Sequence, residues 1–207
     1  MTSRRLLLFD FDGVIADSYE IYREISRLTF EALGMLHLGG EEAYLDLFEE
    51  NFYESLTKRG VDLEAFGKAS RSIVPRFDGR IIPLFKDVMP VIEELARRHT
   101  LVIVSSNSRH FITRALEGSG YQSLFADILG SDFMLSKVKK IAHALAMQGV
   151  AGEHAYFIGD TAGDIREAKK AEVKTIAVTW GWHSKERLLK ANPDFLIDTP
   201  GELLTFE

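Results

Sequence analysis

The chain has 207 residues, a formal net charge of −6 at pH 7 and 46% hydrophobic residues. This length accommodates one large domain, or one domain that carries an insertion. The acidic balance argues against a nucleic-acid-binding domain, which usually has a basic surface. Because the chain contains no cysteine, disulfide bonds and thiol catalysis are excluded.

The sequence has no predicted membrane anchor. Arg4 and Arg5 precede an apolar run, as in a signal peptide, but the run ends after four residues at Asp10 and is too short for one. No apolar stretch approaches the roughly 18 residues that a membrane-spanning helix needs. We therefore expect a cytoplasmic protein, a monomer or homodimer, with no membrane or nucleic-acid partner.

Five short apolar runs predict the strands of a parallel sheet. They do not alternate between polar and apolar residues, which is typical of strands that helices cover on both faces. Helical patterns separate them, and the pattern at 138–145 ends at Gly149. This alternation predicts an α/β fold with right-handed crossovers. The predicted strands are Leu6–Phe9, Leu101–Val104, Phe125–Leu129, Ala155–Ile158 and Lys174–Val178.

The segment 17–83, between the first two predicted strands, is too long for one crossover and has helical patterns. In its first helix, apolar residues recur at helical spacing from Ile21 to Ala32. Asp17 is the predicted N-cap of this helix, with Glu20 in the first turn, and Gly34 is its predicted end.

Two more helices are predicted in this segment, one from Tyr44 to Leu56 and one from Leu63 to Val74. We interpret 17–83 as an α-helical cap inserted after the first strand, and 1–16 with 84–207 as the core. The alternative is a longer helical layer that packs on the sheet.

Polar side chains follow three of the predicted strands. In open parallel sheets, ligands bind where the carboxyl ends of the strands meet. Three carboxylates at one edge would repel one another, unless a divalent cation such as Mg²⁺, which prefers oxygen ligands, holds them together. The polar residues at these strand ends are Asp10 with Asp12, Ser105 to Asn107, and Asp160 with Asp164.

Two of the candidate residues also have a purely structural explanation. Lys137 stands at the start of a predicted helix, where a cation is unfavourable with the helix dipole. It is either a solvated surface lysine or a charge that offsets the acids and a bound phosphate. Asp164 is either part of the acidic site or the cap of its own helix.

Four motifs, in the expected order, resemble those of the haloacid dehalogenase-like superfamily. "DFDGVIADS" resembles its first motif, "VIVSSNS" its second, Ser136–Lys137 its third and "FIGDTAGDI" its fourth. The resemblance extends from Leu6 to about Leu204, and "TWGWHS" and "PDFLIDTPGELL" look like the tail of the phosphoglycolate phosphatase-like branch. It implies a Rossmann-like parallel sheet covered by helices on both faces, with a helical cap.

The resemblance also implies a role for each motif residue. Asp10 would attack phosphorus and form an aspartyl-phosphate, and Asp12 would act as general acid and then general base. Between Ser105 and Ser106, we choose Ser106 as the hydroxyl that binds phosphate, because it directly precedes Asn107. Asn107 and Lys137 would bind the phosphate too. Mg²⁺ would be held by Asp10, Asp160 and the main-chain carbonyl of Asp12, with Asp164 as an auxiliary acid.

We therefore expect a Mg²⁺-dependent phosphatase that hydrolyses a small phosphorylated metabolite, such as a phosphoglycolate-like molecule or a sugar phosphate. The acid at Asp12 favours a phosphomonoester, because related dehalogenases and phosphonatases lack it. A phosphomutase of the β-phosphoglucomutase type is the main alternative. A phospho-accepting signalling module and a non-catalytic binding protein are further alternatives. The basic cap residues from Lys58 to Arg80 either select a second anionic group or are solvated.

Overall fold

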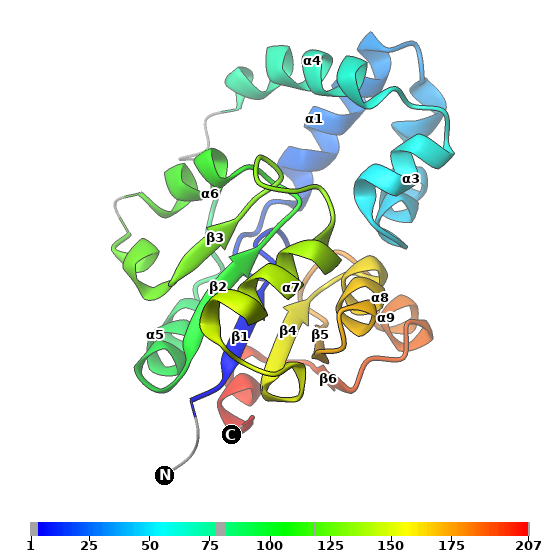
Figure 1. The fold of residues 1–207 in the computed structure, drawn as a ribbon. Coiled ribbons are helices and arrows are strands. Elements are labelled where there is room, and N and C mark those ends of the chain that lie inside the picture. The colour runs from blue at the N-terminus through cyan, green and yellow to red at the C-terminus, as the bar shows by residue number, and fades with distance from the viewer. Residues whose placement is uncertain (1–3, 78–81, 118, 207) are drawn as a thin grey trace.

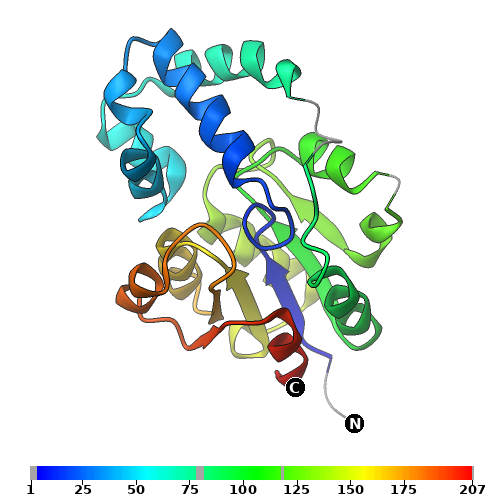
Figure 2. The ribbon, with the colours of Figure 1, turned by 180° about the vertical axis from the view of Figure 1, so that it is seen from behind.

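The computed structural model describes residues 4–77, 82–117 and 119–206. It contains a sheet of six parallel strands in the order β3-β2-β1-β4-β5-β6. Helices cover both faces of this sheet (Figures 1 and 2), so the predicted α/β architecture is confirmed. The strands are β1 Leu6–Phe9, β2 Thr100–Val104, β3 Asp127–Leu129, β4 Ala155–Gly159, β5 Lys174–Val178 and β6 Phe195–Ile197.

The apolar runs are continuous because successive side chains of each strand enter two different cores. On the central strand β1, Leu7 and Phe9 face the core beneath α5 and α6, whereas Leu6 and Leu8 face the core beneath α7 and α8. Both cores are sealed from water, so neither face of the strand carries a polar residue. The helices around the sheet are α5 Met89–Arg98, α6 Arg109–Leu116, α7 Lys137–Gln148, α8 Ala162–Lys170 and α9 Lys185–Lys190.

The sixth strand and the start of the third differ from the sequence prediction. β6 is only three residues long and lies at the edge of the sheet, with Phe195 40% exposed, so it lacks the pattern of a buried strand. β3 begins at Asp127 rather than at Phe125. Within the described ranges, no helix combines the length and the apolar character that crossing a bilayer requires.

Four helices from segment 17–83 gather beyond the carboxyl ends of the strands (Figure 1). The predicted helix from Tyr44 to Leu56 is wrong as a single element. It is divided into α2, a 3-10 helix over Asp46–Phe48, and α3, because Asn51 caps a new helix with its side-chain oxygen. The helices are α1 Tyr19–Ala32, α2 Glu41–Leu45, α3 Phe52–Lys58 and α4 Leu63–Ile73.

The start of α1 also differs from the prediction, because Ser18 and not Asp17 occupies the N-cap position. The Ser18 hydroxyl does not cap the helix but donates a hydrogen bond of 2.8 Å to Asp12 Oδ1. The helix ends one residue before Leu33, and Gly34 follows with a positive φ of 70°, close to its predicted place.

The two chain crossings between core and helical segment lie side by side. The Asp17 amide donates to the Pro83 carbonyl at 2.9 Å, and the Phe85 amide donates to the Ile15 carbonyl at 2.9 Å. This pairing supports the proposed boundaries of a cap at 17–83, of which 78–81 lie outside the described residues. We call α1–α4 and their connections the cap from here on.

The central position of β1 makes its stability contribution testable. Leu8 is fully buried between neighbouring strands. We expect Leu8→Ala to lower the free energy of unfolding by about 2–5 kcal/mol, because the truncation leaves a cavity in a packed core. Leu36→Ala is the control, since Leu36 is 64% exposed, and a change below about 0.5 kcal/mol is expected. Urea denaturation measures both, and equal effects would contradict the assigned core.

Candidate active site

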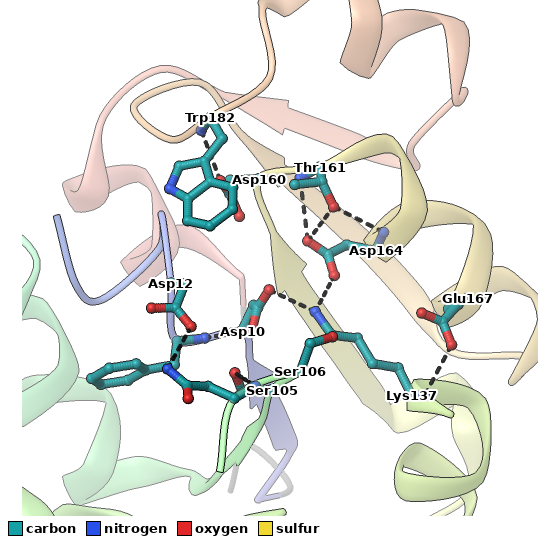
Figure 3. A network of polar contacts seen from close by, with 12 residues as sticks. Asp10, Asp12, Ser105, Ser106, Lys137, Asp160, Thr161, Asp164, Glu167 and Trp182 are labelled. Atoms are coloured by element: carbon teal, nitrogen blue, oxygen red, sulfur yellow. Dashed lines mark hydrogen bonds and ion pairs between the residues drawn. The ribbon is translucent and has the colours of Figure 1, made fainter. Parts of the chain in front are cut away.

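Three buried carboxylates meet at the carboxyl edge of the sheet (Figure 3). Asp10 follows β1 and Asp160 follows the adjacent strand β4, and the Asp10 amide donates to Ile158 at 2.9 Å. Asp164 stands in the first turn of α8. One oxygen from each of these three acids lies within 4.8 Å of the others. The predicted convergence of strand ends is therefore present in the structure.

Lys137 inserts its ammonium group between two of these acids. Its Nζ lies 2.6 Å from Asp10 Oδ2 and 2.5 Å from Asp164 Oδ1, and the residue is only 4% exposed. Ser136 caps α7 and so fixes Lys137 at the first helical position, against the dipole of its own helix. The acids outweigh the dipole, and the interpretation of Lys137 as a solvated surface lysine is wrong.

Asp160 is fully buried, yet one of its carboxylate oxygens has no hydrogen-bond partner among the residues that the structure describes. Oδ2 accepts a hydrogen bond of 2.7 Å from the Trp182 amide, whereas Oδ1 has none. Two glycines allow this close packing, because a Cβ at Gly13 or Gly181 would lie within 2.4 Å of Asp160 Oδ2. An unpartnered buried oxygen beside two further carboxylates is a donor set that a hard divalent cation would complete.

Asp164 performs both of the roles that its sequence position suggested. Its Oδ2 accepts hydrogen bonds from the Thr161 amide and hydroxyl, at 3.2 and 2.8 Å, and so closes a capping box at the start of α8. Its Oδ1 contacts Lys137. The capping box fixes the orientation in which Asp164 joins the acidic group.

The crowding of acids perturbs their protonation. Burial raises the pKa of the Asp10 carboxyl to about 7, and the charge on Lys137 opposes this only in part. Burial also raises the pKa of Asp160 well above its usual range, with Asp164 and Asp10 adding to the effect. Burial alone would lower the pKa of Lys137, but the charges of Asp10 and Asp164 outweigh it and raise that pKa. The site thus holds more acid than one lysine balances.

Asp12 lies at the edge of the same site and is oriented by two side chains. Its Oδ1 accepts from Ser18, and its Oδ2 accepts from Asn107 Nδ2 at 3.3 Å. Burial raises the pKa of Asp12 to about 6, and the hydrogen bonds from Ser18, Asn107 and Ser105 oppose the shift. The Asp12 carboxyl is therefore held toward the cavity, and not toward the Lys137 ammonium that contacts Asp10.

The two candidate serines occupy different positions. Ser105 is 1% exposed, accepts from the Asn107 amide at 3.0 Å, and helps to lower the pKa of Asp12. Ser106 is half-buried, and its carbonyl accepts a hydrogen bond of 2.8 Å from the Tyr53 hydroxyl of the cap. The side chain beside the acids is thus that of Ser105.

A cavity of about 910 Å³ lies between the acids and the cap. Asp10, Asp12 and Lys137 line its core side, and aromatic residues of α1, α3 and α4 line its cap side. Tyr22 of α1 hydrogen bonds to Asn107, so the cap also contacts the group that orients Asp12.

The motif order and this geometry agree with one family. A sequence model described as haloacid dehalogenase-like hydrolase matches residues 7–178. The chain belongs to this family. It is therefore an enzyme of the hydrolase class, and its relatives place it among the family's phosphatases.

Two curated relatives match this chain over nearly its whole length. The chain is 29% identical over 202 residues to a phosphoglycolate phosphatase of Synechococcus elongatus, and the match covers 96% of this chain and 94% of the relative. It is also 29% identical over 213 residues to the pyrophosphatase PpaX of Oceanobacillus iheyensis, covering 98% and 96%.

Solved structures agree with the fold. A haloacid dehalogenase-like hydrolase of Streptococcus pneumoniae superposes with a TM-score of 0.81 at 25% identity, over 100% of this chain and 99% of that one. A predicted phosphatase of Clostridium acetobutylicum superposes with a TM-score of 0.84 at 21% identity, over 98% of each chain. The second likeness concerns the fold alone.

Three buried polar residues near the site were not predicted from the sequence. Lys140 Nζ donates to the Ser105 carbonyl, and burial lowers the pKa of this lysine to about 8. Glu167 accepts from the Lys137 amide at 2.9 Å. Asn51 Nδ2 in turn donates to both Glu167 oxygens at 3.0 Å, although the two residues are far apart in sequence.

Helical spacing could have indicated two of these three. Lys140 follows Lys137 by three residues and shares a face with Ile141 and Ala144, all buried. Glu167 stands in the same relation to Asp164 on α8. Asn51 followed by Glu54 fits the pattern of a helix N-cap, but no local pattern indicates the contact of Asn51 with Glu167 in the core.

Most of the basic cap residues do not reach the cavity. Lys58 pairs with Glu50 at 3.1 Å on the surface, and Lys68 and Arg76 are exposed. Arg71 of α4 lines the cavity, and Arg80 lies outside the described residues. The solvated interpretation therefore fits the described residues better than a basic face toward the site.

The contact between Asn51 and Glu167 joins the cap to α8, at the carboxylate that also accepts from the Lys137 amide. Asn51→Ser keeps an oxygen for the N-cap of α3 but removes the amide that reaches Glu167. We expect it to lower the free energy of unfolding by about 1–3 kcal/mol, because a buried carboxylate loses its donor. Asp62→Ser, at the exposed N-cap of α4, is the matched control with a change below about 0.5 kcal/mol. Similar losses in both variants, measured by urea denaturation, would show that Asn51 acts only as a helix cap.

Proposed function

We propose that this enzyme is a Mg²⁺-dependent phosphatase that hydrolyses a small phosphomonoester through an aspartyl-phosphate on Asp10. The observation that carries the proposal is the contact of Asp10 with the Lys137 ammonium at the wall of a cavity, with Asp12 two residues away. Phosphoryl transfer depends on placing a nucleophile and positive charge around phosphorus.

The covalent step is a displacement at phosphorus by one oxygen of Asp10. The bond from that oxygen to phosphorus forms, the bond to the leaving alkoxide breaks, and protonated Asp12 supplies the proton that the alkoxide takes up. Asp12, now a carboxylate, then removes a proton from water, whose oxygen attacks the phosphorus of the aspartyl-phosphate. Phosphate leaves, Asp10 is released, and Asp12 is protonated again.

The remaining polar groups hold the phosphoryl oxygens. The burial of Ser105 and the hydrogen bond that its hydroxyl accepts from the Asn107 amide support Ser105 over Ser106 as the hydroxyl that binds phosphate. Asn107 and Lys137 also bind the phosphoryl oxygens in this proposal. Lys137 neutralises negative charge that the transferring group shares with Asp10.

Asp10 and Asp160 would hold Mg²⁺, with Asp164 nearby and the Asp12 carbonyl as a further ligand. The unpartnered Oδ1 of Asp160 and the excess of carboxylate over lysine support this assignment. When bound, Mg²⁺ offsets the like charges of nucleophile and phosphate. The relatives named phosphoglycolate phosphatase and pyrophosphatase support a small phosphorylated metabolite as substrate.

The nucleophile is tested by Asp10→Asn. We expect it to abolish phosphate release from p-nitrophenyl phosphate, because an amide cannot form the acyl-phosphate. Asp17→Asn, an exposed aspartate outside the site, is the control and retains activity. Release of phosphate by a folded Asp10→Asn variant at the wild-type rate would refute the proposal, and isomerisation of a hexose 1-phosphate without release would favour a mutase.

The metal site is tested by calorimetry without substrate. We expect Mg²⁺ to bind the intact chain and raise its Tm, because the ion stabilises the state that binds it. Asp160→Asn removes a charged ligand and is expected to weaken Mg²⁺ binding at least tenfold. An unchanged affinity would remove Asp160 from the proposed ligands.

A further inference from the structure

A continuous series of aromatic rings runs along the cavity wall away from the acids. Trp182 follows β5 and packs edge-on against Phe48, with ring centroids 4.9 Å apart. Phe48 stacks on Phe52 at 5.0 Å, and Phe52 contacts Phe66 of α4 at 5.9 Å. All four residues line the cavity that also contains Asp10 and Asp12.

These rings are not needed to fill the interior of the cap. The cap has its own fully buried residues, including Phe30, Leu47 and Leu56. The four rings of the wall are only partly buried against them. They therefore keep apolar surface toward the cavity, and removing that surface from water is favourable when an apolar group covers it.

The size of the cavity and the position of its charged residues also favour a large apolar group as its occupant. Its volume of about 910 Å³ lies near the upper end of the range for pockets that enclose drug-sized ligands. A substrate with a short anionic tail would leave most of it unfilled, and a charge placed against the ring wall would be desolvated without a partner there. Lys137 is already held between Asp10 and Asp164, and the other basic residues of the lining, Arg71, His110 and Arg114, are not part of the ring wall.

We infer that the physiological substrate is a phosphomonoester whose alcohol part carries a ring or a comparably large apolar group. The ring wall of Phe48, Phe52, Phe66 and Trp182 receives that group while the phosphate lies at Asp10. This inference rests on the proposed phosphatase function and narrows its substrate class.

The test compares esters whose alcohols have similar reactivity. The kcat/KM of the full-length enzyme with Mg²⁺ is measured for ethyl phosphate, 2-phenylethyl phosphate and phosphoglycolate. We expect 2-phenylethyl phosphate to exceed each of the others at least tenfold, about 1.4 kcal/mol. Equal values for the ethyl and phenylethyl esters would overturn the inference. So would a preference for phosphoglycolate that is lost in Arg71→Ala.

Variants of the wall make the test specific. Phe52→Ala is expected to reduce the ratio of the phenylethyl to the ethyl value at least fivefold, and Leu36→Ala, on the exposed side of the cap, to preserve it. Phe52→Leu is used if Phe52→Ala does not fold, with a smaller reduction expected. An unchanged ratio in a folded Phe52 variant overturns the inference.

The reference substrate p-nitrophenyl phosphate separates two kinds of failure. If the enzyme hydrolyses it but not 2-phenylethyl phosphate, the substrate class is wrong and the phosphatase function stands. If p-nitrophenyl phosphate is not hydrolysed either, both proposals are overturned.

Discussion

Repulsion among buried carboxylates is the constraint on which the rest of the site depends. Asp10, Asp160 and Asp164 bring oxygens within 4.8 Å of one another, and the Lys137 ammonium contacts two of them. In a low-dielectric interior each unbalanced acid is costly, so the chain tolerates this cluster only with compensating charge. The burial of Lys137 in the first turn of α7, against the helix dipole, is explained by the same requirement.

The order of the strands in the sheet brings the acidic residues and their neighbours together at one edge. β2 and β4 both pair with β1, so residues that are distant in the chain end at one edge. The loop after β2 brings Asn107 to Asp12, and Ser18 approaches Asp12 from the other side, at the entry to the cap. A single parallel sheet thereby orients both Asp10, the proposed nucleophile, and Asp12, the proposed acid and base. Gly13 permits the close approach of Asp160 to the loop that follows β1.

Sequence patterns could predict the strands and their terminal acids because most residues of a doubly covered strand are apolar, which makes a following aspartate easy to recognise. They could not predict β6, whose three edge residues are partly exposed and carry no such pattern. The choice of Asp17 as N-cap was wrong because Ser18 occupies that position and its hydroxyl binds Asp12 instead. The break before α3 depends on Asn51, whose amide binds Glu167 in the core. These outcomes are decided by tertiary partners that a local pattern does not contain.

Cap and core are joined through groups that contact the proposed catalytic residues. Glu167 accepts hydrogen bonds from the Lys137 amide and from Asn51 of the cap, so the start of α7 and the start of α3 share one buried carboxylate. Phe52 directly follows Asn51 and belongs to the aromatic wall of the cavity. A substrate that touches that wall would therefore contact the start of α3, which is linked through Glu167 to the Lys137 amide. Because both elements meet at Glu167, one short path of packed and hydrogen-bonded residues connects the aromatic wall of the cavity with the lysine beside Asp10.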